Sequence, residues 1–374
     1  MGGVTGIRTD ERASERRARV GLTWLAEPGD AVLGREIERV GPVGVLERIS
    51  AQDPDLPGRR NYAVRLPRAD IDACLEAVDS CGGRVVIPGD GEWPTQLDDL
   101  GPARPIALFV RGHDLRLAAV RSVAVVGARA ATAYGVTVAA DLAAALADAG
   151  WAVVSGGAYG VDAAAHRGAL SASGPTVAVL ACGLDVVYPR GHASLLEQVA
   201  TAGTLISELP PGMHPTRSRF LQRNRMIAAL TRGTVVVEAA MRSGALNTAG
   251  HAAELGRPVL GVPGPVTSAA SAGVHRLFRE TGAQVVVDAA QVIEALGLIG
   301  ELAPEPSVPR RVTDGLDPVA LRVFDALPAR RPLPLSEVAV AAGLDPVLVG
   351  GALSRLGVLG LVISGDRGWQ LAHR

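Results

Sequence analysis

Short runs of β-branched and apolar residues alternate with alanine-rich stretches over most of this chain, and this alternation constrains its fold more than any other feature. Each run suits one strand buried on both faces, and each stretch between runs has the spacing of an amphipathic helix. The alternation predicts an α/β fold with a mostly parallel, doubly wound sheet, because parallel strands need crossover connections. Strands are expected at 121–126, 151–155, 176–180, 203–207, 233–237, 258–262 and 284–287, with helices at 135–149, 160–172, 219–231 and 245–255.

The segment before this region, residues 1–80, predicts a small helical module. An apolar pattern with helical spacing runs from Trp24 to Val40 and is then broken by a Gly-Pro-Val-Gly sequence. Two further helices are expected, at 45–49 and 69–78.

The segment after the α/β region begins with a predicted linker, 298–315, which is rich in proline and has little periodicity. Residues 316–374 are too short for another α/β unit. Their pattern predicts three helices, at 318–327, 335–342 and 346–356, and a β-hairpin at 361–371, an order that resembles a winged helix. This segment carries 6 arginines and 5 acids, a balance that suits a protein contact or packing role at least as well as DNA reading.

All 37 basic residues of the chain are arginine. A Walker A phosphate loop, a pyridoxal-phosphate Schiff base and the protein-kinase signature each require a lysine, so these three classes are excluded. A bound phosphate would meet guanidinium groups or backbone N–H groups instead. The formal net charge is −1, so any nucleic-acid site has to be local.

The cysteine and histidine spacings predict neither a disulfide framework nor a metal site. The three cysteines form no CxxC pair, and the seven histidines show neither HExxH nor HxH spacing. No cofactor is expected. The N-terminal segment lacks the apolar core of a signal peptide, and no apolar run is long enough for a transmembrane helix, so a cytoplasmic protein with no membrane contact is expected.

Two glycine-containing turns follow neighbouring predicted strands. In a doubly wound sheet, ligands bind beyond the carboxyl ends of the strands, where such turns present N–H groups to an anion. The alternative is that the glycines only permit tight turns. The candidate phosphate-binding residues are Gly127 and Arg129 in the first turn and Ser155, Gly156, Gly157 and Gly160 in the second.

A basic segment lies between Glu208 and Glu238: 29 residues with five arginines and no acid. Guanidinium groups beside an aromatic ring suit a phosphate backbone and one stacked base. The alternatives are a solvated basic helix end, or arginines paired with acids elsewhere. The candidate DNA-binding residues here are Arg217, Arg219, Phe220, Arg223, Asn224 and Arg225.

Three acidic or basic side chains allow either a chemical or a structural role. Asp162 and His166 are one helical turn apart, as an acid/base pair would be, although a packing hydrogen bond is the more common outcome. Glu238 ends a predicted strand and could be a general base, but a structural ion pair with Arg223 or Arg225 is the favoured interpretation.

Seven ordered blocks of sequence are similar to the DNA-processing protein A family (DprA/Smf), in its actinobacterial form. They are VVGARAATAYG (125–135), SGGAYGVDAAAHRGAL (155–170), VLACGLDVVYP (179–189), LISELPPG (205–212), RFLQRNRMIAAL (219–230), VVVEAAMRSGALNTA (235–249) and VPGPVTSAASAG (262–273). The resemblance implies an extended Rossmann-like DNA-binding domain at 81–297, a SAM-like module at 1–80 and a winged helix at 316–374. It also implies sequence-independent binding of single-stranded DNA, loading of the recombinase RecA in natural transformation or recombination, displacement of single-strand-binding protein, a homodimer, and no catalytic activity.

The resemblance also implies individual roles. Arg129 matches the family's phosphate-binding arginine, Arg217 falls where lysine often faces DNA, and Phe220 falls at the base-contacting aromatic. The Arg-Asn-Arg run at 223–225 corresponds to a family element that we interpret as scaffold and pocket wall. The remaining residues assigned to the structure of the pocket are Asp162, His166, Glu238, Ser243 and Asn247.

Two other functions fit parts of the sequence. A nucleotide hydrolase of the lysine-decarboxylase-like class has a similar Rossmann pocket, but the PGGxGTxxE motif of that class is absent. A winged-helix regulator with the α/β body as sensor is disfavoured by the balanced charge of 316–374.

Overall fold

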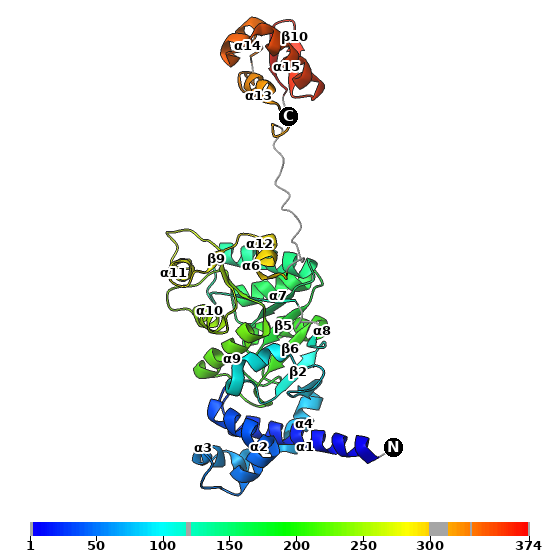
Figure 1. Ribbon diagram of the computed structural model, residues 1–374, viewed down its shortest axis with the longest axis vertical. Helices are drawn as coiled ribbons and strands as arrows, with labels where there is room; N and C mark the ends of the chain where they lie inside the picture. The colour runs from blue at the N-terminus through cyan, green and yellow to red at the C-terminus, as the bar shows by residue number, and fades with distance from the viewer. Residues whose placement is uncertain (1–2, 117–120, 299–312, 330, 373–374) are drawn as a thin grey trace. The chain divides into compact units, whose positions relative to one another are not determined.

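The computed structural model describes residues 3–116, 121–298, 313–329 and 331–372 (Figure 1). The chain forms two compact units, 1–304 and 305–374, each described here by itself. Most of the predicted linker, residues 299–312, lies outside the described residues.

The first unit is built around a nine-stranded sheet with the order β1-β2-β6-β5-β4-β3-β7-β8-β9. The strands from β3 to β9 pair in parallel, whereas β1 pairs antiparallel with β2, and β2 with β6. The predicted mostly parallel, doubly wound sheet is therefore confirmed. The strand bounds are β1 (Gly83–Val86), β2 (Leu108–Gly112), β3 (Ser122–Val126), β4 (Ala152–Ser155), β5 (Thr176–Val179), β6 (Thr204–Ser207), β7 (Thr234–Val236), β8 (Val259–Gly261) and β9 (Gln284–Val285).

All seven predicted strands are present, and the sequence missed β1 and β2. These two strands extend the sheet beyond β6. The segment between them, residues 87–107, contains the short 3-10 segment η2 and not a long helix like those that connect the parallel strands. The direction of winding reverses between β3 and β7, so the turn after β3 lies at the switch point of the sheet, where ligands bind in this class of fold.

Helices cover both faces of the sheet because successive residues of each buried strand point to opposite sides. In β3, Ala124 and Val126 pack with α9 and α10, whereas Val123 and Val125 pack with α6, α7 and α12. The helices of this region are α6 (Ala133–Asp148), α7 (Val161–Ser171), α8 (Ala193–Ala202), α9 (Arg217–Leu230), α10 (Gly244–Glu254), α11 (Ala272–Glu280) and α12 (Ala289–Leu296), with short 3-10 segments η2 (Thr95–Ala103) and η3 (Arg190–His192).

The helical module at the N-terminal end packs around Leu22, Leu33 and Val45. The expected helix from Trp24 to Val40 is interrupted: one helix ends at Leu25, and the next starts after Asp30, whose carboxylate caps it. Pro28 and Gly29 (φ 78°) lie in this break. The predicted break at Gly41 is present as a kink within α2. The elements are α1 (Gly3–Leu25), α2 (Ala31–Ser50), α3 (Arg59–Ala63), η1 (Leu66–Arg68) and α4 (Ile71–Ser80).

The second unit has the predicted order of three helices and a hairpin around a core that includes Val323, Val338 and Leu353. No single helix in the described ranges is long and apolar enough to cross a membrane. The helices α14 and α15 reach that length and apolar composition only when taken together, and they are bent by 103° at the break between them. The winged-helix assignment stays a prediction. The elements are α13 (Pro318–Asp325), α14 (Leu335–Ala342), α15 (Pro346–Val358), β10 (Val362–Gly365) and β11 (Gly368–Leu371).

Candidate functional site

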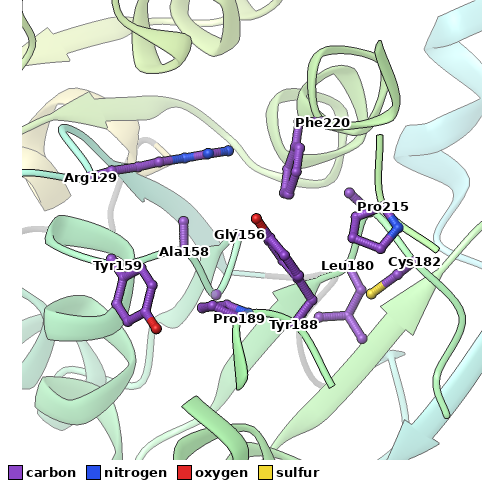
Figure 2. Close-up of a pocket in the computed structure, with 12 residues that line it drawn as sticks. Arg129, Gly156, Ala158, Tyr159, Leu180, Cys182, Tyr188, Pro189, Pro215 and Phe220 are labelled. Atoms are coloured by element: carbon purple, nitrogen blue, oxygen red, sulfur yellow. The ribbon is translucent and has the colours of Figure 1, made fainter. Parts of the chain in front are cut away.

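A small pocket, partly open to solvent, lies at the carboxyl edge of the sheet (Figure 2). Its walls come from the turn after β3, the turn after β4, the long loop after β5, and the start of α9. The lining residues are Arg129, Gly156, Gly157, Ala158, Tyr159, Leu180, Ala181, Cys182, Tyr188, Pro189, Pro215 and Phe220.

The two glycine turns are packed directly against each other. Gly160 has a φ of 78°, and a Cβ there would lie 2.2 Å from the carbonyl oxygen of Ala128 and 2.6 Å from that of Arg129. The backbone N–H of Val161 donates to the same Ala128 oxygen at 3.2 Å. Gly160 therefore permits the close approach that fixes the backbone of Arg129, rather than lining the pocket itself.

Arg129 and Phe220 both line the pocket and contact each other. The family resemblance had assigned both residues to one site. The guanidinium carbon of Arg129 lies 4.5 Å from the centroid of the Phe220 ring, a cation–π contact. Within the part of the chain that the structure describes, Arg129 has no acidic partner. Its exposed guanidinium is thus free to meet an anion while it stays in contact with the ring.

Arg217 is the first residue of α9 and is exposed, one turn before Phe220. It does not line the pocket, and no acid among the described residues pairs with it. The side chain of Thr216 caps the helix by accepting from the N–H of Arg219 at 3.3 Å. Arg217 is therefore an exposed charge one helical turn before Phe220, which lines the pocket.

Arg219 has a partner from the N-terminal module. Its Nε and Nη2 atoms lie 2.9 Å and 3.0 Å from the two carboxylate oxygens of Glu27, and Arg65 also donates to Glu27 at 2.7 Å. The hydrogen bond from Arg219 holds the pKa of Glu27 below its usual value. Arg219 is therefore paired in this structure, with a carboxylate that it shares with Arg65.

Arg223, Asn224 and Arg225 are buried scaffold residues, and the structure does not support direct DNA contact by them. Arg223 donates to the carbonyl oxygens of Gly156 and Val179, and burial lowers its pKa to about 10. Asn224 donates to the carbonyl of Gly244 at 3.2 Å and to the side chain of Asn247 at 3.1 Å. The Arg225 guanidinium lies 2.6 Å from a carboxylate oxygen of Glu208, and both side chains are buried.

Most of the predicted residues in the second glycine turn have a structural role. Ser155 is fully buried and donates to the carbonyl of Val125 at 2.7 Å, so its hydroxyl cannot contact a ligand. Gly156 leaves room for Arg223, because a Cβ there would lie 2.4 Å from that guanidinium. Gly157 lines the pocket, whereas Gly127 packs against Val161 of α7.

Asp162 and His166 do not form an acid/base pair. The hydroxyl of Thr176 donates to the carbonyl of Val153 at 2.9 Å, so at 2.8 Å it accepts from Nδ1 of His166. Burial lowers the pKa of His166 to about 3. Asp162 instead accepts from the N–H of Ala158 at 3.4 Å and holds the glycine turn, and burial raises its pKa.

Glu238 does not pair with Arg223 or Arg225, so the favoured prediction was wrong. Its carboxylate is 1% exposed and accepts from the backbone N–H of Thr132 at 2.9 Å and from the Thr132 hydroxyl at 2.6 Å. Glu208, at the other end of the basic segment, is the acid that pairs with Arg225. Glu238 thus holds the start of α6 and is not placed as a general base.

Two further predicted residues stabilise the start of α10. The side chain of Ser243 caps this helix by accepting from the N–H of Ala245 at 3.2 Å, and Asn247 accepts the bond from Asn224. In the described ranges, no three His, Cys, Asp or Glu side chains come together as a metal site.

The sequence analysis missed two exposed tyrosines that line the pocket. Tyr159 is 49% exposed and Tyr188 is 42% exposed. Both lie in loops that follow predicted strands, at the edge where ligands bind. Aromatic residues make up only 3% of the chain, so their position in these loops was the available signal.

The fold and pocket define a Rossmann-like protein with a cationic, aromatic site at the switch point of its sheet. Comparison with known proteins identifies the class further. The model of the DNA recombination-mediator protein A family matches residues 84–297. A relative from Mycobacterium tuberculosis (strain H37Rv), named as a DNA processing protein of the DprA type, is 46% identical over 368 residues, which cover 95% of this chain and 94% of the relative. This chain therefore belongs to the DNA recombination-mediator protein A family.

Two solved structures are similar to this chain. The X-ray structure of DNA processing protein A from Streptococcus pneumoniae has a TM-score of 0.64 and 31% identity, covering 75% of this chain and 96% of the other. A structure of DNA processing protein A from Helicobacter pylori, described as giving insight into the single-stranded DNA binding mode of that protein, has a TM-score of 0.52 and 28% identity, covering 57% of this chain and 95% of the other.

Proposed function

We propose that this chain binds single-stranded DNA without sequence preference, at the pocket formed by Arg129 and Phe220. The observation that carries the proposal is the contact between these two side chains, which brings an exposed guanidinium and an aromatic ring to one point of the carboxyl edge. A guanidinium suits a phosphate, and a ring suits an unpaired base. The described DNA-binding mode of the Helicobacter pylori relative supports the same ligand.

The expected chemistry explains why no sequence preference is proposed. Phosphate contacts carry no base information, and every base has a face that can stack. One stacked base contributes about 1–3 kcal/mol, so a single pocket binds weakly. We therefore propose a homodimer, in which two pockets on one strand would gain avidity.

The test is fluorescence anisotropy with oligo(dT) and with a duplex of the same length, over a series of salt concentrations. We expect clear selectivity for the single strand and an affinity that falls steeply with salt, because phosphate binding releases counterions. Equal affinity for the duplex, or no binding of either DNA, would contradict the proposal. Light scattering after gel filtration tests the dimer.

We also propose that the chain loads the recombinase RecA onto single-stranded DNA and displaces single-strand-binding protein, in natural transformation or recombination. The family description, recombination mediator, supports this role. The test is ATP hydrolysis by RecA on a strand already covered with single-strand-binding protein. We expect the chain to shorten the lag before hydrolysis, and an Arg129→Ala variant to lose this effect. An unchanged lag with the wild-type chain would contradict the proposal.

A further inference from the structure

A ring on the loop after β5 extends the aromatic surface of the pocket. The Tyr188 ring centroid lies 5.5 Å from that of Phe220, with the rings tilted by 50°. In Figure 2, the hydroxyl end of Tyr188 points toward Arg129 and Phe220. Phe220 therefore contacts two planar groups, the guanidinium of Arg129 and the ring of Tyr188.

The structure holds Tyr188 and Phe220 in position through bonds between their two loops. The N–H of Gly183, in the loop after β5, donates to the carbonyl of Met213 at 2.9 Å. The N–H of Gly212, in the loop before α9, donates to the carboxylate of Asp185 at 2.9 Å. These bonds connect the loop that carries Tyr188 to the loop that leads into the helix of Phe220, so contacts within the protein hold the two rings close together.

The environment of Tyr188 differs from that of the two other tyrosines near this edge. Tyr134 is exposed to a similar degree, 41%, but its hydroxyl donates to the carbonyl of Pro263 at 2.6 Å. Tyr159 packs edge-on against His192, with 4.4 Å between ring centroids. The hydroxyl of Tyr188 has no hydrogen-bond partner among the residues that the structure describes, and 42% of the residue is exposed beside the open pocket.

We propose that Tyr188 is a second base-stacking residue of the DNA site, which allows one more base to stack beside Arg129 and Phe220. This inference rests on the proposed function. A base stacked on the Tyr188 ring would lie beside the Phe220 ring, which itself contacts the cation of Arg129. Aromatic faces accept any base, so Tyr188 would add affinity without adding sequence preference.

The test compares two ligands of equal length: oligo(dT) and a strand in which the central nucleotides lack bases. Tyr188→Leu keeps apolar bulk but removes the ring, Tyr188→Phe keeps the ring, and Tyr134→Ala is the matched control outside the pocket. We expect Tyr188→Leu to bind oligo(dT) about 5- to 150-fold more weakly, from the loss of one stacked base. Tyr188→Phe should retain most of the affinity, and Tyr134→Ala should match the wild type. On the abasic strand, Tyr188→Leu should bind as the wild type does.

A second readout reports on stacking directly. A strand carrying 2-aminopurine loses fluorescence when that base stacks, so the wild-type chain should quench it and Tyr188→Leu should quench it less. Wild-type affinity of Tyr188→Leu for oligo(dT), equal losses on both strands, or a loss in Tyr188→Phe as large as in Tyr188→Leu would each overturn the inference. If Arg129→Ala loses binding while Tyr188→Leu does not, only this inference fails. If the wild-type chain does not bind oligo(dT), the proposed function fails with it.

Discussion

At the scale of single residues, the two arginines of the site have different surroundings and should respond differently to the same substitution. The Arg129 guanidinium makes a cation–π contact with the Phe220 ring, whereas Arg217 is an exposed charge at the start of α9. Lysine carries the charge but has neither the planar face nor the bidentate fork of arginine. We expect Arg217→Lys to keep most of the affinity for oligo(dT) and Arg129→Lys to lose several-fold more, as measured by anisotropy at one salt concentration. The reverse order would mean that Arg217 makes the geometry-dependent contact.

His166 links stability to pH. Its pKa is about 3 in the folded chain, whereas an ordinary histidine has a pKa near 6.5, so the unfolded chain binds more protons between these values. The contribution of neutral His166 is therefore fully present above about pH 6.5 and is lost as the pH falls toward 3, with a slope of up to about 1.4 kcal/mol per pH unit. In His166→Asn, whose amide can still donate to Thr176, urea unfolding should depend less on pH between 7 and 4.5. The same pH dependence in both proteins would assign the acid sensitivity to other groups.

At the scale of elements, the helix α9 carries exposed and buried arginines that cannot be told apart in the sequence. Arg217 begins the helix in solvent, whereas Arg223 and Arg225 are 5% and 6% exposed. The sequence indicated a basic segment with no acid, but the partner of Arg225, Glu208, lies before the loop that leads into the helix. Which arginines turn inward depends on how α9 packs on the sheet, and local composition does not contain that information.

The buried pair of Glu208 and Arg225 yields a prediction for the stability of this element. Removing one partner leaves an uncompensated buried charge, so Glu208→Ala should lower the free energy of unfolding by about 3–5 kcal/mol. The double variant Glu208→Ala/Arg225→Met should recover part of this loss, because it removes both charges. Urea unfolding of the single and double variants measures the coupling. A double variant less stable than Glu208→Ala alone would show that Arg225 has a further role.

The strands, too, were only partly predictable from the sequence pattern. The parallel strands were predictable because their buried β-branched runs alternate with helices. The antiparallel strands β1 and β2 were not, since each carries an arginine, Arg84 or Arg111, within an otherwise apolar run. Arg129 and Phe220 were assigned to one site by family resemblance, whereas Tyr188 required the folded loop after β5 to bring it 5.5 Å from Phe220.

At the scale of the whole first unit, one acidic residue connects the helical module to α9, the helix that carries Phe220. Glu27 lies in the break between α1 and α2 and pairs with Arg219, the neighbour of Phe220 in the sequence. A phosphate approaching the start of α9 has to compete with Glu27 for this guanidinium. The N-terminal module therefore neutralises part of the positive charge at the start of α9, even though it lies outside the sheet that carries the pocket.

Glu27→Gln should release Arg219 and raise the affinity for oligo(dT), and the slope of log affinity against log salt should steepen by about one phosphate contact, a change of roughly 0.7 for single strands. Glu15→Gln, which removes an acid paired with Arg12 and Arg19 elsewhere in the module, is the matched control and should leave DNA binding unchanged. Arg219→Ala should have little effect alone but should cancel the gain when combined with Glu27→Gln, because the same guanidinium is the cause of both results. A gain that persists in the double variant would point instead to Arg65, the other cation that Glu27 holds in this structure.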